Sequence, residues 1–114
     1  MNMRKIILFF ALLMISAGIF ATSPQKVELK FDKSTGILEV IIKHKSKDVE
    51  KHYIDEVIVE VNGEEVAVET IEEQSDKVFE NLEFTLEDVN VGDEIKVIAK
   101  CNKFGRKSEK LEVE

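Results

Sequence analysis

The sequence of 114 residues predicts an all-β protein, an immunoglobulin-like antiparallel β-sandwich of about seven strands preceded by a signal peptide. Three observations predict this fold class. Apolar and polar side chains alternate along short segments, turn residues separate those segments, and no helical period follows residue 21. The length allows one small domain and no more.

The amino-terminal segment, residues 1–21, has the order of a secretory signal peptide. Arg4 and Lys5 form a basic start, and residues 6–20 are an uninterrupted run of apolar or small side chains that leads to cleavage after Ala21. As a helix this run reaches roughly 22 Å, short of the ~30 Å hydrocarbon core, which disfavours a permanent span, and we expect no stable membrane span after cleavage. An uncleaved anchor is the alternative, and it would keep the same domain outside the membrane. The mature domain, residues 22–114, is then exported and either periplasmic or extracellular.

The composition of the mature domain excludes several classes of partner. After residue 21 there are 14 basic and 23 acidic side chains, a net charge of −9. Phosphate backbones and anionic lipids repel such a polyanion, so we expect neither nucleic acid nor a membrane surface as partner. The sequence does not indicate a protein partner. Because Cys101 is the only cysteine, the domain has no internal disulfide and must rely on a packed core or on a metal.

The first three strands are predicted by side-chain pattern. Apolar and charged residues alternate over residues 26–31, as in a half-buried strand. Gly36 starts the second strand, residues 37–43. The third strand, residues 52–61, is rich in β-branched side chains, which favour extended backbone.

The next two strands follow from a hairpin signal. Asn62-Gly63 is the strongest short hairpin signal, and it returns the chain into a fourth strand over residues 65–71. Apolar residues spaced by two or four over residues 78–86 then predict one or two further strands.

Two turns delimit the end of the chain. Residues 90–93 form the first, and the strand after it, residues 95–101, has Cys101 on the same face as its apolar side chains. Residues 102–105 then turn the chain into a last strand with Leu111 and Val113 on one side. From this alternation we expect the core of the sandwich to contain Val57, Val59, Phe84 and Val97.

Three side chains are candidates for chemistry. His44 and His52, the only histidines, flank a polar loop between two strands, and Cys101 ends a later strand. A loop and a strand end can meet at one end of a sandwich, and two imidazoles with a thiolate hold iron, copper or zinc. Surface histidines and a small core cysteine are the alternative interpretation. A Cys-His nucleophile pair is disfavoured, because nothing in the sequence marks an oxyanion hole.

Two short motifs contain two of the three candidate ligands. The first is His52-Tyr53-Ile54, preceded by Glu50 and followed by the valine-rich segment that ends at Asn62-Gly63. The second is Cys101-Asn102-Lys103-Phe104-Gly105. Together they resemble the motifs of the desulfoferrodoxin or superoxide reductase family, whose second motif is Cys-Asn-x-His-Gly. Members of the family are immunoglobulin-like sandwiches whose iron, held by four histidines and a cysteine, reduces superoxide to hydrogen peroxide.

The resemblance implies a metal site with fewer protein ligands than the family's. His44 and His52 fall on the family's paired central ligands and Cys101 on its axial thiolate, while Phe104 stands where the family has another histidine. Water, Asp48 or Glu50 would complete the ligand shell. The expected function is an exported superoxide reductase-like protein that binds iron through His44, His52 and Cys101 and reduces superoxide weakly or not at all. The alternative is a non-catalytic binding or structural module of the cell envelope with a decayed metal site.

Overall fold

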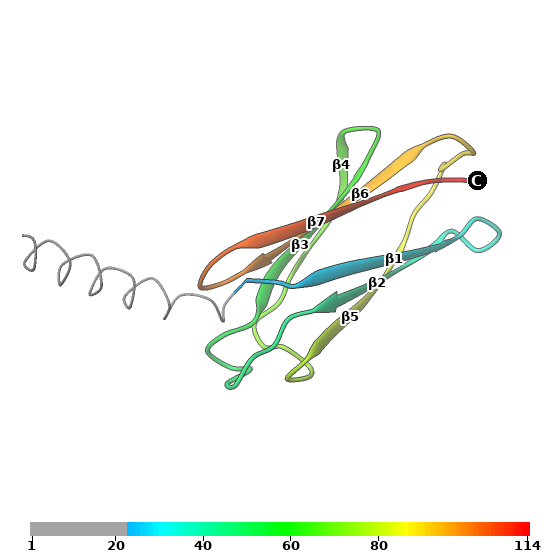
Figure 1. The fold of residues 1–114 in the computed structure, drawn as a ribbon. Helices are drawn as coiled ribbons and strands as arrows, with labels where there is room; N and C mark the ends of the chain where they lie inside the picture. The colour runs from blue at the N-terminus through cyan, green and yellow to red at the C-terminus, as the bar shows by residue number, and fades with distance from the viewer. Residues whose placement is uncertain (1–22) are drawn as a thin grey trace, which may run out of the picture.

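A computed structural model of the protein describes residues 23–114. This part of the chain contains seven β-strands and no helix (Figure 1). The strands are β1 (Lys26–Asp32), β2 (Ile37–Lys43), β3 (Ile54–Val61), β4 (Glu64–Thr70), β5 (Phe79–Thr85), β6 (Glu94–Cys101) and β7 (Arg106–Glu112).

The strands form two antiparallel sheets, which confirms the predicted all-β sandwich. One sheet has the order β1-β2-β5 and the other the order β4-β3-β6-β7. In constant-type immunoglobulin domains the fourth strand belongs to the sheet of the first two. Here the Asn62-Gly63 hairpin keeps β4 beside β3, because both turn residues have positive φ, 52° and 84°, as a tight two-residue turn requires.

The core lies between the two sheets and follows the alternation of the sequence. Val57, Val59 and Val97 are fully buried, as predicted, and Phe84 is half-buried against the same cluster. A period of two directs alternate side chains to one face, so each inner strand contributes every second residue. The buried apolar residues are Val27, Leu38, Val40, Ile42, Ile54, Val57, Val59, Leu86, Ile95, Val97, Ala99 and Val113.

The structure corrects the predicted start of the third strand. The third strand begins at Ile54 rather than at residue 52, because the His52 N–H bonds back to the Asp48 carbonyl in a turn. The segment predicted as one or two strands over residues 78–86 is a single strand, β5. The signal peptide and the predicted cleavage point lie outside the described residues. Between residues 23 and 114 there is no helix that could span a membrane.

The two ends of the sandwich carry different connections. At one end lie the long loops that join β2 to β3 and β4 to β5, together with the short β6–β7 turn (Figure 1). At the other end lie the β1–β2 and β3–β4 turns and the β5–β6 connection. The candidate functional residues belong to the first of these ends.

Candidate metal centre

His44, His52 and Cys101 come together in the fold. Their ligand atoms all lie within 4.8 Å of one another. The imidazole rings of the two histidines meet edge to face, with centroids 4.6 Å apart and planes at 77°. These three residues are both histidines and the single cysteine of the whole sequence, yet they come from positions as far apart as 44 and 101.

The position of His44 follows from the alternation of β2. Leu38, Val40 and Ile42 face the core, and His44 continues the same face two residues on. Its side chain is completely buried. Its backbone N–H donates to the Val78 carbonyl at 2.8 Å, which prolongs the pairing of β2 with the segment before β5. The interpretation of His44 as a surface histidine is therefore wrong.

Cys101 is placed by the same rule at the end of β6. Ile95, Val97 and Ala99 face the core, and Cys101 follows on that face, half-buried. Its N–H donates to the Gly105 carbonyl at 3.0 Å, closing the β6–β7 turn. The Lys103 N–H donates to Cys101 Sγ at 3.4 Å, which orients the sulfur. Gly105 has φ +84°, and a Cβ there would collide with the Ser23 side chain.

His52 is held beside Cys101 by Asn102. The Asn102 Oδ1 accepts the Tyr53 N–H at 3.0 Å, and its Nδ2 donates to the Lys51 carbonyl at 2.9 Å. Its backbone N–H also donates to the Tyr53 carbonyl at 3.0 Å. Asn102 therefore forms hydrogen bonds with the residues on both sides of His52. These residues lie about fifty positions before Asn102 in the sequence.

A β-bulge completes this local arrangement. In the pairing of β3 with β6 the register shifts between Ile54 and Glu56, and Ile54 lies opposite Cys101. A bulge bends its strand and re-aims the neighbouring side chains, which is why bulges are common beside functional sites. Here the bulge lies two residues after His52, at the point where the loop enters the sheet.

Gln74 is a site residue that sequence reasoning missed. It lies in the loop between β4 and β5, within an acidic run, and only 1% of its surface is exposed. Its Oε1 lies 2.7 Å from His44 Nδ1. The one available sequence signal was an amide in a run of carboxylates, over residues 72–76, which by itself is typical of a solvated loop.

The other residues considered for the ligand shell do not join the three. Asp48 lines the mouth of the site, but its Oδ1 accepts the Glu50 N–H at 3.1 Å in a local turn. Glu50 is exposed. Phe104, which stands where the resemblance leads to a further imidazole, lies in the β6–β7 turn with 56% of its surface exposed.

A pocket with a basic rim opens over His52. Its volume is about 710 Å³, and five of the residues that line it are lysines, against one acid, Asp48. The lysines are Lys45, Lys47, Lys51, Lys77 and Lys103. The pocket is therefore lined mainly by basic groups, although the exposed acids Glu50, Glu72, Glu73 and Asp76 stand on the loops of the same end.

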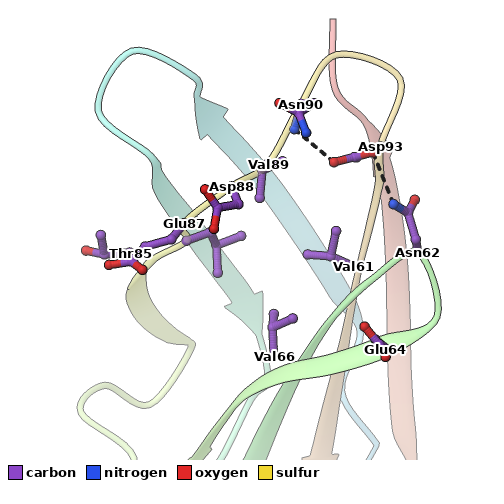
Figure 2. A pocket seen from close by; sticks show the side chains of 11 residues that line it. Val61, Asn62, Glu64, Val66, Thr85, Glu87, Asp88, Val89, Asn90 and Asp93 are labelled. Carbon is purple, nitrogen blue, oxygen red and sulfur yellow. Dashed lines mark hydrogen bonds between the residues drawn. The ribbon is translucent and has the colours of Figure 1, made fainter.

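The opposite end of the sandwich has the reverse character. A pocket of about 600 Å³ there is lined by the acids Glu64, Glu87, Asp88 and Asp93 and by no basic residue (Figure 2). Asp93 is engaged within it, accepting hydrogen bonds from the Asn90 N–H and the Asn62 side chain at 2.8 and 3.0 Å. These bonds, the Asn90 N–H first, hold the pKa of Asp93 below its usual value. The pocket is lined by no histidine or cysteine, and Asp93 in it serves to join the β3–β4 and β5–β6 connections.

Comparison with models of known protein families and with curated proteins gave no match to this chain.

Proposed function

We propose that this protein is an exported metalloprotein in which His44, His52 and Cys101 bind one transition-metal ion. The observation that carries the proposal is the convergence of the only two histidines and the only cysteine on one point, within 4.8 Å. The β2–β3 connection supplies His44 at its start and His52 near its end, and the end of β6 supplies Cys101. The signal-like amino terminus supports export.

The set of donor atoms fits a metal ion of intermediate softness. Two imidazole nitrogens and a thiolate suit zinc, iron or copper, and three protein ligands leave at least one position open. Zn–N bonds near 2.0–2.1 Å and a Zn–S bond near 2.3 Å place neighbouring ligand atoms roughly 3.3–3.6 Å apart in a tetrahedron. The separation of up to 4.8 Å exceeds that spacing by about 1.2–1.5 Å, a difference that rotation of the half-buried His52 and Cys101 side chains closes.

Iron and superoxide are the more specific form of the proposal. The motifs around His52 and Cys101 resemble those of the superoxide reductase family, and the five lysines of the pocket favour the approach of a small anion. A ferrous ion at this site would supply the single electron that, with two protons, converts superoxide to hydrogen peroxide. The protein's own contribution is to hold the ligands, admit the anion along a positive rim and leave a coordination position open.

The alternative is a cell-envelope module whose metal site has decayed. It is favoured by the phenylalanine at position 104, where the resemblance leads to a further imidazole. This alternative predicts no metal at His44, His52 and Cys101 and no effect of substitutions there on any spectrum.

Metal content and absorption distinguish the two. Mature protein purified from an iron-replete culture should contain about one metal ion per chain. The ferric form should absorb visible light through thiolate-to-iron charge transfer, and Cys101→Ser should abolish that band. Ser108→Ala, a similarly small change on the exposed strand β7, is the control and should leave the band intact. Protein without metal, or a band that survives Cys101→Ser, would overturn the proposed metal site.

Superoxide reduction is tested separately on the iron-loaded protein. Peroxide formed per superoxide consumed is measured with an external electron donor. Lys77→Gln at the pocket should lower the second-order rate by about twofold to tenfold at low salt, and added salt should remove the difference. Lys33→Gln, in the β1–β2 turn at the far end, is the control. Iron binding without peroxide formation would refute the reductase activity and would leave the proposed metal site unaffected.

A further inference from the structure

Gln74 is an amide buried at the centre of the loops that carry the candidate ligands. Burial of an unpaired amide is costly, so the partners of such a group identify its role. Its backbone N–H donates to the Val49 carbonyl at 3.1 Å, which ties the β4–β5 loop to the β2–β3 loop. Its side-chain Nε2 donates to two carbonyl oxygens, that of His44 at 2.8 Å and that of Asp76 at 2.6 Å.

These contacts determine which way the amide faces. With Nε2 between two carbonyl oxygens, both of its hydrogens are used, and Oε1 points the other way. There Oε1 accepts the Ile54 N–H at 3.4 Å and lies 2.7 Å from His44 Nδ1. The reversed amide would set its oxygen against two other acceptors and its NH₂ group against the Ile54 N–H, losing all three bonds.

The orientation of the amide decides where His44 carries its proton. Gln74 Oε1 is only an acceptor, so a hydrogen bond over 2.7 Å requires the hydrogen on His44 Nδ1. A neutral imidazole protonated at Nδ1 has its lone pair at Nε2. Because His44 is completely buried and its backbone is bonded to Val78 and to Gln74, the ring has little freedom to turn.

We propose that Gln74 is a positioning residue that holds His44 as the Nδ1–H tautomer and thereby makes Nε2 its metal-ligating atom. This inference rests on the proposed metal-binding function and adds to it the identity of the ligating atom and of the group that selects it. A partner on the second ring nitrogen of a ligating histidine fixes its orientation and raises its basicity. Gln74 prepares the site in this way before any metal arrives.

The tautomer is measured directly in the metal-free mature protein. The chain has only two histidines, so the nitrogen resonances of two imidazole rings in uniformly ¹⁵N-labelled protein can be assigned with His52→Ala. We expect the His44 ring to carry its proton on Nδ1, and addition of Zn²⁺ to shift the Nε2 resonance while Nδ1 stays protonated. A proton on Nε2 in the metal-free protein, or zinc bound at Nδ1, would overturn the inference.

A pair of variants separates positioning from loop stability. Gln74→Met keeps the length of the side chain and removes its hydrogen bonds, and it should weaken Zn²⁺ binding by about 10- to 100-fold and mix the two tautomers. Glu80→Gln is the matched control, because buried Glu80 holds the same loop through Ser75 at 2.8 and 3.2 Å. It should change zinc affinity by less than about threefold and leave the tautomer unchanged.

The outcomes distinguish this inference from the proposed function. Zinc binding with the His44 proton on Nε2 refutes the role of Gln74 and leaves the metal site standing. An Nδ1–H tautomer in a protein that binds no zinc refutes the metal site, and with it the ligating role of Nε2. Equal loss of affinity in Gln74→Met and Glu80→Gln shows that Gln74 supports only the loop. If Gln74→Met does not fold, the wild-type spectrum decides the question.

Discussion

Asn102→Ala tests whether the hydrogen bonds between the Asn102 side chain and the His52 loop position the candidate metal ligands. The substitution removes two side-chain hydrogen bonds with backbone groups, from the Tyr53 N–H at 3.0 Å and to the Lys51 carbonyl at 2.9 Å, and a longer one from the Cys101 thiol to Oδ1 at 3.9 Å. It keeps the backbone bond to the Tyr53 carbonyl. Each lost bond with the backbone contributes about 0.5–1.5 kcal/mol, so the free energy of unfolding should fall by about 1–3 kcal/mol, near the lower limit because water can reach the exposed groups.

The effect on metal binding should exceed the effect on stability. Without the Asn102 side chain the loop around His52 keeps only its backbone bond to residue 102, and Zn²⁺ affinity, measured by competition with a chromophoric chelator, should fall about tenfold or more. Unfolding by denaturant gives the stability change on the same samples.

Asn62→Ala is the matched control at the opposite end of the sandwich. Asn62 also makes two side-chain hydrogen bonds, to Asp93 at 3.0 Å and from the Glu94 N–H at 3.0 Å. Its φ of 52° adds a further ~1–2 kcal/mol of strain for alanine, so this variant should be destabilised at least as much as Asn102→Ala. Zinc affinity should be unchanged in it. An equal loss of affinity in both variants, or none in Asn102→Ala, would refute the reasoning.

Three further predictions concern the core, the turn and the acid limb of stability. Val57→Ala should lower the free energy of unfolding by about 1–3 kcal/mol, whereas Val66→Ala, at an exposed position of β4, should change it by less than about 0.5 kcal/mol; similar losses in urea melts would show that the faces are misassigned. Phe104→His adds an imidazole to the turn closed by Cys101 and should strengthen iron binding in a chelator competition; unchanged affinity would place residue 104 outside the ligand shell. The pKa of Asp93 is lowered by the Asn90 N–H and then by Asn62, so its contribution is full above the unfolded value of 3.8 and is lost as pH falls through the lower folded pKa. Asp93→Asn should therefore flatten the decline of stability between about pH 5 and pH 2, and an acid limb as steep as that of the wild type would contradict this assignment.

Much of the fold could be predicted because strand alternation is a local property. Val57, Val59 and Val97 are buried as their spacing predicts, and the Asn62-Gly63 turn joins β3 to β4 as expected. The start of β3 was misplaced because a β-branched run predicts extended backbone but does not reveal that the His52 N–H is already bonded to Asp48. A local pattern contains no information about such competing bonds.

The candidate site divides in the same way. The sequence by itself determined that Cys101 faces inward, because a side-chain period of two continues from Ala99, and it drew attention to His44 and His52 as the only imidazoles. Only the tertiary structure decided that all three meet, that Asn102 anchors the His52 loop and that Gln74 faces His44 Nδ1. The physical reason is the separation along the chain of the residues that determine each property. The direction of a side chain depends on its own strand, whereas these contacts join loops whose meeting depends on which strands pair and on how the two sheets stack.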